Sequence, residues 1–145
     1  MASVREQILD YIVEQLNAVS GVTAVRSRLA PVPRSEGTLV IVTWQSETAA
    51  EQVMNGVERT LAIKLSIVAR GDVPDTVADA VAVKVYAKLK GTDLVARMGG
   101  LAWTPILETG RINQMEEADG GAADYQMFFE VTYRTVIGDE TTQPT

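Results

Sequence analysis

The sequence predicts an α+β domain in which two helices pack on one face of a mostly antiparallel sheet. Two segments, near residues 4–19 and between Asp72 and Gly91, carry apolar residues at helical spacing. Two others, 57–69 and 125–137, alternate apolar and polar residues as half-buried strands do. The expected order of elements is α-β-β-β-α-β-β, and burying both helices against one sheet face is a common layer solution.

The first helix is expected over about residues 4–19. Ser3 and Glu6 have the spacing of a capping box, in which a hydroxyl and a carboxylate each satisfy a free backbone N–H. The buried stripe is expected to hold Val4, Ile8, Ile12, Leu16 and Val19. Gly21 closes the helix, and a strand over 22–29 follows until the prolines of the next loop end it.

A long hairpin is expected in the middle of the chain. Residues 38–44 (TLVIVTW) are apolar on both faces, as in a covered central strand. Residues 45–56 are polar and are expected to form a long loop, and Val53 and Met54 within it are candidates for contacts with a partner. In the strand over 57–69, the inward face is expected to hold Leu61, Ile63, Leu65 and Ile67.

The second helix has clear start and stop signals. Asp72 is expected to cap it, Pro74 suits its first turn, and Gly91 ends it. Acidic residues lie early and lysines late, which matches the helix dipole. The expected buried stripe is Val77, Val81, Val85 and Leu89.

The last third is expected to hold a short helical turn (92–100), a strand broken at Pro105 (101–112), a polar loop (113–123) and a long strand (125–137). The inward face of that last strand is expected to hold Tyr125, Met127, Phe129, Val131, Tyr133 and Ile137. The end of this strand marks the C-terminal boundary of the expected domain.

The whole chain is expected to form a single domain over residues 1–138, with a disordered C-terminal tail over 139–145.

Composition removes most catalytic chemistry. Among the 145 residues there is no cysteine and no histidine, so thiol nucleophiles, thiolate metal sites and histidine bases are excluded. No phosphate-binding or dinucleotide-binding motif occurs. We therefore expect no enzyme activity, no catalytic residue, no metal and no cofactor. Trp44 and Trp103 fit either the core or an interface, and the core is the favoured interpretation.

Charge is distributed unevenly along the chain. The net charge of −6 comes from residues 108–145, whereas residues 1–107 are neutral. A stretch without acids carries Arg26, Arg28 and Arg34, and the densest acidic group is Glu116, Glu117 and Asp119. Such polarity suits contacts between subunits or rings, and these six residues are interface candidates. Ordinary solvated surface is the competing interpretation, and for the acidic group it is favoured over a cation site.

The N-terminus has charges where a signal peptide needs an apolar run, and no stretch is long and apolar enough to span a membrane. A soluble protein made in a cytoplasm is expected. The absence of a strongly basic face argues against sequence-specific binding of nucleic acid.

The layout resembles the tail-terminator proteins, also called minor tail or tail-completion proteins, of long-tailed bacteriophages. The segments that carry the resemblance are VREQILDYIVEQL, GVTAVRSRLAPVP, TLVIVTW, RTLAIKLSIVAR, ADAVAVKVYAKL, MGGLA and YRTVIGD, in that order. They span about residues 3–139 and rest on order and length rather than on a catalytic motif.

The resemblance implies a structural virion protein that forms a hexameric ring on the last ring of the tail tube. The ring would stop tube polymerisation, present a surface to the head–tail connector or completion protein, and let DNA pass. Its place would be the head-proximal end of the tail, after assembly in the host cytoplasm. The alternatives are another head–tail connector, head-closure or tail-tube component, or, in a different class, a small α+β ligand-binding domain or carboxylate-dependent enzyme.

Overall fold

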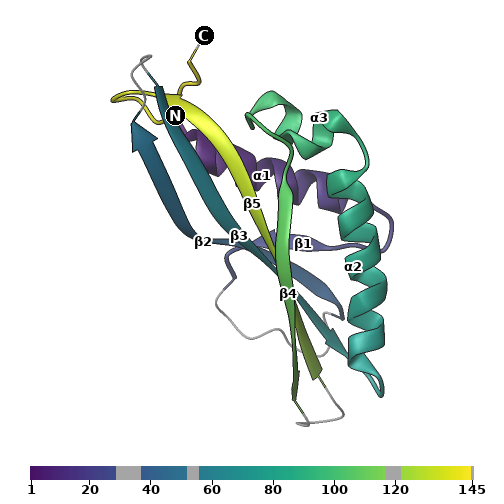
Figure 1. The fold of residues 1–145 in the computed structure, drawn as a ribbon. Helices are drawn as coiled ribbons and strands as arrows, with labels where there is room; N and C mark the ends of the chain where they lie inside the picture. The colour runs from purple at the N-terminus through teal and green to yellow at the C-terminus, as the bar shows by residue number, and fades with distance from the viewer. Residues whose placement is uncertain (29–36, 52–55, 117–121, 145) are drawn as a thin grey trace.

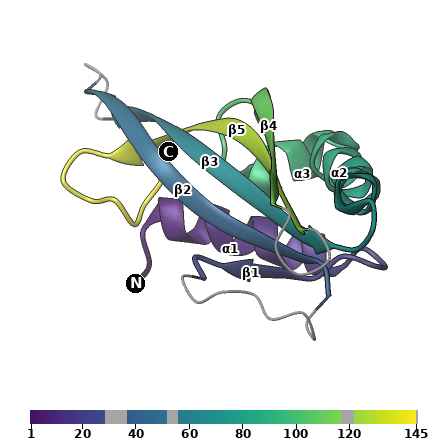
Figure 2. The ribbon, with the colours of Figure 1, turned by 90° about the horizontal axis from the view of Figure 1, so that it is seen from below.

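The computed structural model describes residues 1–28, 37–51, 56–116 and 122–144, and it confirms the predicted α+β class. Five strands form one sheet in the order β1-β2-β3-β5-β4, with α1 and α2 packed on one face (Figures 1 and 2). Only the β1–β2 pair is parallel. The elements are α1 (Val4–Asn17), β1 (Ala24–Arg26), β2 (Leu39–Glu51), β3 (Gly56–Arg70), α2 (Pro74–Lys90), α3 (Asp93–Ala96), the 3-10 turn η2 (Met98–Gly100), β4 (Leu107–Glu116) and β5 (Ala122–Val136).

Helix α1 begins as the sequence predicts but uses half of the expected capping box. The Ser3 hydroxyl accepts a hydrogen bond from the Glu6 amide at 3.1 Å, whereas the Glu6 carboxylate pairs with Arg26 of β1. The helix ends two residues earlier than expected, at Asn17. The Asn17 side chain bonds both the N–H and the C=O of Ala24, at 2.8 and 3.0 Å, and so ties the helix end to β1.

Strand β1 is much shorter than the predicted strand over 22–29. It holds three residues because Ser27 takes a φ of 42°, a left-handed conformation that cannot continue a ladder. The Ser27 amide still donates to the Val42 carbonyl at 2.9 Å. The strand therefore closes one edge of the sheet along only part of β2.

The hairpin of β2 and β3 is longer than predicted. Residues 45–51, expected as the first part of a loop, continue β2, and 46–51 pair with 57–62 of β3. The inward face of β3 is confirmed, since Leu61, Ile63, Leu65 and Ile67 are all buried. In Figures 1 and 2, the end of β2 and the start of β3 extend beyond the N-terminal end of α1.

Helix α2 covers the predicted segment, and Val81, Val85 and Leu89 of the predicted stripe are buried as expected. Its buried residues are Pro74, Ala78, Val81, Ala82, Val85 and Leu89, and Val77 is exposed. Only Val77 of the predicted stripe is wrong, and Ala78 and Ala82 complete the buried face instead, where their small side chains let the helix approach the sheet. The predicted Asp72 cap is also wrong, because Val73 holds the cap position without a side-chain bond.

The last two strands meet in a second hairpin. Strand β4 begins after Pro105 rather than at residue 101 and runs through 113–116, where a loop was expected. Strand β5 likewise begins at Ala122, three residues before the expected start. The pairing of β4 with β5 imposes this extension on polar residues. Met127, Phe129, Val131 and Tyr133 of the predicted inward face are buried, whereas Ile137, just after the end of β5, is exposed.

The chain ends lie at the same end of the molecule (Figure 1). The Val4 amide donates to the Glu140 carbonyl at 2.8 Å, and the Val136 amide donates to the Thr142 carbonyl at 2.9 Å. The Gln143 amide reaches the Gly100 carbonyl at 3.1 Å. The disorder expected for 139–145 stays a prediction, and hydrogen exchange at these amides is the measurement that tests it.

Candidate functional site

A β-bulge in β2 sets up the most polar part of the interior. The register of β2 against β3 shifts between Trp44 and Ser46, so that Gln45 is the extra residue. Trp44 lies opposite Ile63 and Glu47 lies opposite Leu61. Both side chains therefore lie on the helix-covered face, where strict alternation would have placed Ser46.

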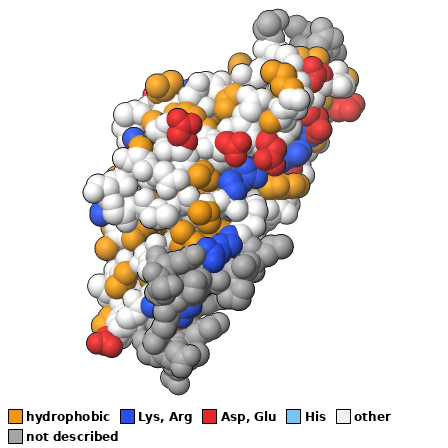
Figure 3. All heavy atoms as spheres, turned by 180° about the vertical axis from the view of Figure 1, so that it is seen from behind, with side chains coloured by type: hydrophobic (Ala, Val, Ile, Leu, Met, Phe, Trp, Pro, Cys, Tyr) orange, Lys and Arg blue, Asp and Glu red, His pale blue; other side chains and the backbone are white. Residues whose placement is uncertain are grey.

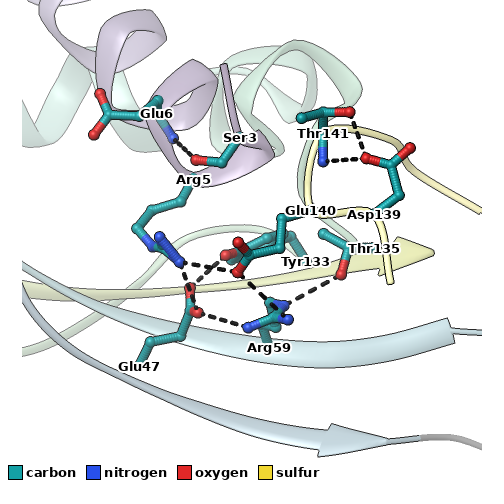
Figure 4. Close-up of polar contacts among 10 residues, drawn as sticks. All are labelled: Ser3, Arg5, Glu6, Glu47, Arg59, Tyr133, Thr135, Asp139, Glu140 and Thr141. Atoms are coloured by element: carbon teal, nitrogen blue, oxygen red, sulfur yellow. Dashed lines mark hydrogen bonds and ion pairs between the residues drawn. The ribbon is translucent and has the colours of Figure 1, made fainter. Parts of the chain in front are cut away.

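Glu47 is the centre of a cluster that we call the Glu47 cluster, consisting of Arg5, Glu47, Arg59, Tyr133, Thr135 and Glu140 (Figure 4). The Glu47 carboxylate, 9% exposed, lies 3.1 Å from Arg59 Nη1 and 3.4 Å from Arg5 Nη2. It also accepts a hydrogen bond from the Tyr133 hydroxyl. Arg59 Nε donates to Thr135 Oγ1 at 3.2 Å.

Glu140 supplies the second carboxylate of the cluster. It lies 3.5 Å from Arg5 and 3.6 Å from Arg59, with its side chain 55% exposed. Two carboxylates thus face two guanidinium groups, which balances the buried charge. The cluster links α1, β2, β3, β5 and the segment after β5, and its geometry holds these elements together.

Burial raises the pKa of the Tyr133 hydroxyl, and the hydrogen bond to Glu47 raises it further. The phenol therefore stays protonated and serves as a donor to the carboxylate. Since both carboxylates are paired with arginines, the arrangement favours a structural role for these groups over proton transfer.

The predicted site residues are only partly brought together. Arg26 of β1 pairs within the chain, with Glu6 at 3.0 Å and Asp10 at 2.7 Å, and is 24% exposed. Arg28 follows β1 and is partly exposed. Glu116 ends β4, at the opposite edge of the sheet from β1. The remaining candidates, Arg34, Val53, Met54, Glu117 and Asp119, lie outside the described residues.

On the surface seen from behind, in Figure 3, several acidic side chains gather in the upper part of the view. Acidic and basic side chains lie next to one another there, with apolar side chains between them. The pKa of Glu6 is held below its usual value mainly by the hydrogen bond from Arg26.

Both tryptophans differ from the favoured prediction of core burial. Trp44 is 42% exposed and Trp103 is 54% exposed. Each stacks on an arginine, Trp44 with Arg5 at 4.8 Å and Trp103 with Arg134 at 3.8 Å from the guanidinium carbon to the ring centre. Both tryptophans are therefore partly exposed surface residues that stack on arginines, and they are not core residues.

Within the described ranges, no helix is long and apolar enough to cross a membrane. The same part of the chain shows no group of three or more acidic side chains placed to hold a metal ion.

Comparison with known proteins gives a likeness of fold. No protein-family model and no curated protein matches the chain. Among solved structures, a chain described as "Virion of native gene transfer agent (GTA) particle" aligns with a TM-score of 0.65 and 17% sequence identity. The alignment covers 93% of this chain and 100% of that one. The two chains therefore share a fold over essentially their whole lengths.

Proposed function

We propose that this protein is a structural component of a phage-like virion, and specifically the tail terminator. The observation that carries the proposal is the shared fold with a chain of the gene transfer agent virion, over all of that chain. The predicted layout of a tail-terminator protein, an α+β domain with the same element order, agrees with it.

In this role the protein forms a hexameric ring on the last ring of the tail tube and stops its polymerisation. Its partners are further copies of itself, the tail-tube protein and the head–tail connector or completion protein, and DNA passes through the ring. The Glu47 cluster supports a rigid building block, because it fixes five segments of the chain to one another. No catalytic step is part of this function.

The test is electron microscopy of tubes assembled from the tail-tube protein of the same particle, with and without this protein. We expect a single additional ring at one tube end and tubes that stop growing once it is bound. Open-ended stacking of the purified protein by itself would instead identify a tube subunit. Closed rings that leave tube growth unchanged would identify another connector component.

A further inference from the structure

The segment that follows β5 lies against the Glu47 cluster (Figure 4), and we call its residues 138–144 the Glu140 segment. The Glu140 carboxylate lies 3.5 Å from Arg5 Nη2 and 3.6 Å from Arg59 Nη2, so one carboxylate faces both guanidinium groups. The Glu140 carbonyl accepts a hydrogen bond from the Val4 amide at 2.8 Å. That amide is at the start of α1, where N–H groups have no partner within the helix. Glu140 therefore occupies a site built by two arginines and a helix start.

This site needs a second carboxylate besides that of Glu47. The side chains of Arg5 and Arg59 are 19% and 18% exposed, and that of Glu47 is 9% exposed. Without Glu140, two guanidinium groups would face one carboxylate where water reaches poorly, and a charge left unbalanced there is costly. The Val4 amide would also lose its acceptor. A carboxylate and a backbone carbonyl from one segment restore both, which is the chemistry of an acidic residue in a peptide.

The Glu140 segment is held weakly in the site. None of residues 138–144 is buried, and the Glu140 side chain is 55% exposed. Hydrogen bonds tie down its far end, where the Val136 amide donates to the Thr142 carbonyl at 2.9 Å and Gln143 Nε2 donates to the Leu101 carbonyl at 3.1 Å. A segment with few buried apolar contacts opens locally at a lower free energy than the core does. The site can therefore be vacated while the sheet and its helices stay folded.

We propose that Arg5, Arg59 and the Val4 amide form a binding site for an acidic segment of a partner protein, which enters when the Glu140 segment is released. The incoming segment supplies one carboxylate to the two guanidinium groups and one carbonyl to the Val4 amide, as Glu140 does within the chain. In the isolated chain the Glu140 segment closes the site, because its tether gives it an effective concentration in the millimolar range. The proposal goes beyond the proposed function, since it concerns the isolated chain and does not require a ring.

The test is an NMR titration of the full chain with a synthetic peptide of residues 138–144 (GDETTQP), followed at the Val4 and Val136 amides. In the Glu140→Gln protein, the segment that closes the site has lost its charge. The peptide is therefore expected to bind this variant about threefold more tightly than it binds wild type. A peptide that itself carries Glu140→Gln is expected to bind the same variant about threefold more weakly than the unchanged peptide does.

The matched control is Asp139→Asn, which removes the neighbouring charge of the same segment. The Asp139 carboxylate accepts hydrogen bonds from Thr141 and Thr142 of its own segment, at 3.0 and 2.8 Å. This variant is expected to bind the peptide as wild type does. Binding as tight as that of Glu140→Gln would show that the loss of either charge opens the site, against a specific role for Glu140.

Other results would also overturn the site. A Glu140→Gln protein whose amides show no saturable shift at millimolar peptide would show that the site takes no segment from outside the chain. Equal binding by wild type and Glu140→Gln would show that Glu140 does not close it, and equal binding of the two peptides would show that the arginines do not recognise the carboxylate. If Glu140→Gln does not fold, Gln143→Ala replaces it, because it removes the bonds to the Gly100 and Leu101 carbonyls and loosens the same segment. This variant is likewise expected to bind the peptide more tightly than wild type, and failure to do so would contradict the proposal while leaving the proposed ring untouched.

Discussion

The Tyr133 hydroxyl donates a hydrogen bond to the Glu47 carboxylate across β3, the strand that separates their own strands. Tyr133 is 1% exposed and the Glu47 side chain is 9% exposed, so water is largely excluded from this pair. An unpaired polar group in such a place costs about 1–3 kcal/mol. The pair therefore depends on the bulge at Gln45, which brings Glu47 to this face.

Glu47→Gln is expected to lower the free energy of unfolding by about 1–3 kcal/mol. The amide can still accept a hydrogen bond from Tyr133, but Arg5 and Arg59 lose the charge that balances theirs. Urea denaturation measures the change. The matched control is Glu58→Gln, whose pairing with Arg134 is one-third exposed on both sides and is worth about 0–1 kcal/mol. Equal effects of the two substitutions would show that the Glu47 cluster stabilises the fold no more than the partly exposed Glu58–Arg134 pair does.

Because the pKa of Tyr133 is raised in the folded protein, we expect the protein to lose stability at high pH. Its folded pKa is raised by burial and by Glu47, so the unfolded chain releases this proton first as the pH passes about 10. The folded state then binds more protons than the unfolded one, and the free energy of unfolding falls as pH rises. Below pH 10 the contribution is fully present.

Urea denaturation between pH 9 and 11 tests this dependence. Tyr133→Phe is expected to show a shallower decline than wild type, by up to about 1.4 kcal/mol for each pH unit. Tyr86→Phe, at an exposed tyrosine, controls for the loss of a phenol and is expected to keep the wild-type slope. Identical slopes for wild type and Tyr133→Phe would contradict the assignment.

Elements whose apolar residues recur at a regular spacing could be predicted from the sequence. Elements that are extended only because a neighbouring strand pairs with them could not. The inward face of β3 follows from alternation at Leu61, Ile63, Leu65 and Ile67, where each residue has one environment. Residues 45–51 lack that alternation and are extended only because β3 pairs with them. Their strand structure comes from the partner and not from local preference.

No motif or spacing in the sequence indicated the Glu47 cluster. Its residues come from distant parts of the chain, and one bulge at Gln45 decides which face Glu47 occupies. Trp44 shows the same limit, since β1 pairs with β2 only as far as Val42 and Trp44, two residues further along β2, is 42% exposed. The interface candidates chosen from charge stay predictions, and nothing in the sequence indicated that Arg26 is already paired with Glu6 and Asp10 within the chain.

Arg26→Ala is expected to lower stability by at most about 1 kcal/mol at neutral pH, because its partners Glu6 and Asp10 are largely exposed. Glu6 has a pKa lowered by Arg26, so this contribution is present above the unfolded pKa and is lost as the pH falls through the folded pKa. Thermal unfolding at pH 7 and pH 3 measures it. A difference between wild type and variant that is larger at pH 3 would have the wrong sign.

The basic stretch that carries Arg26, Arg28 and Arg34 is expected to contribute to contacts between subunits, as its lack of acidic residues predicts. Arg26 already pairs with two acids of α1, so reversing it would disturb the fold as well as any interface. The better test is the double substitution Arg28→Glu and Arg34→Glu, with Arg26→Ala as the control for the fold.

The strands that carry Arg26 and Glu116 lie at opposite edges of the sheet. The strand that carries Arg26 in one copy can therefore face the strand that carries Glu116 in the next, and a ring repeats that contact at every interface. Assembly of the double variant, followed by light scattering, should be weaker than that of wild type at low salt. The difference should shrink near 1 M salt, where the Debye length falls to about 3 Å. Equal assembly of both proteins at low salt would mean that these arginines are solvated surface only.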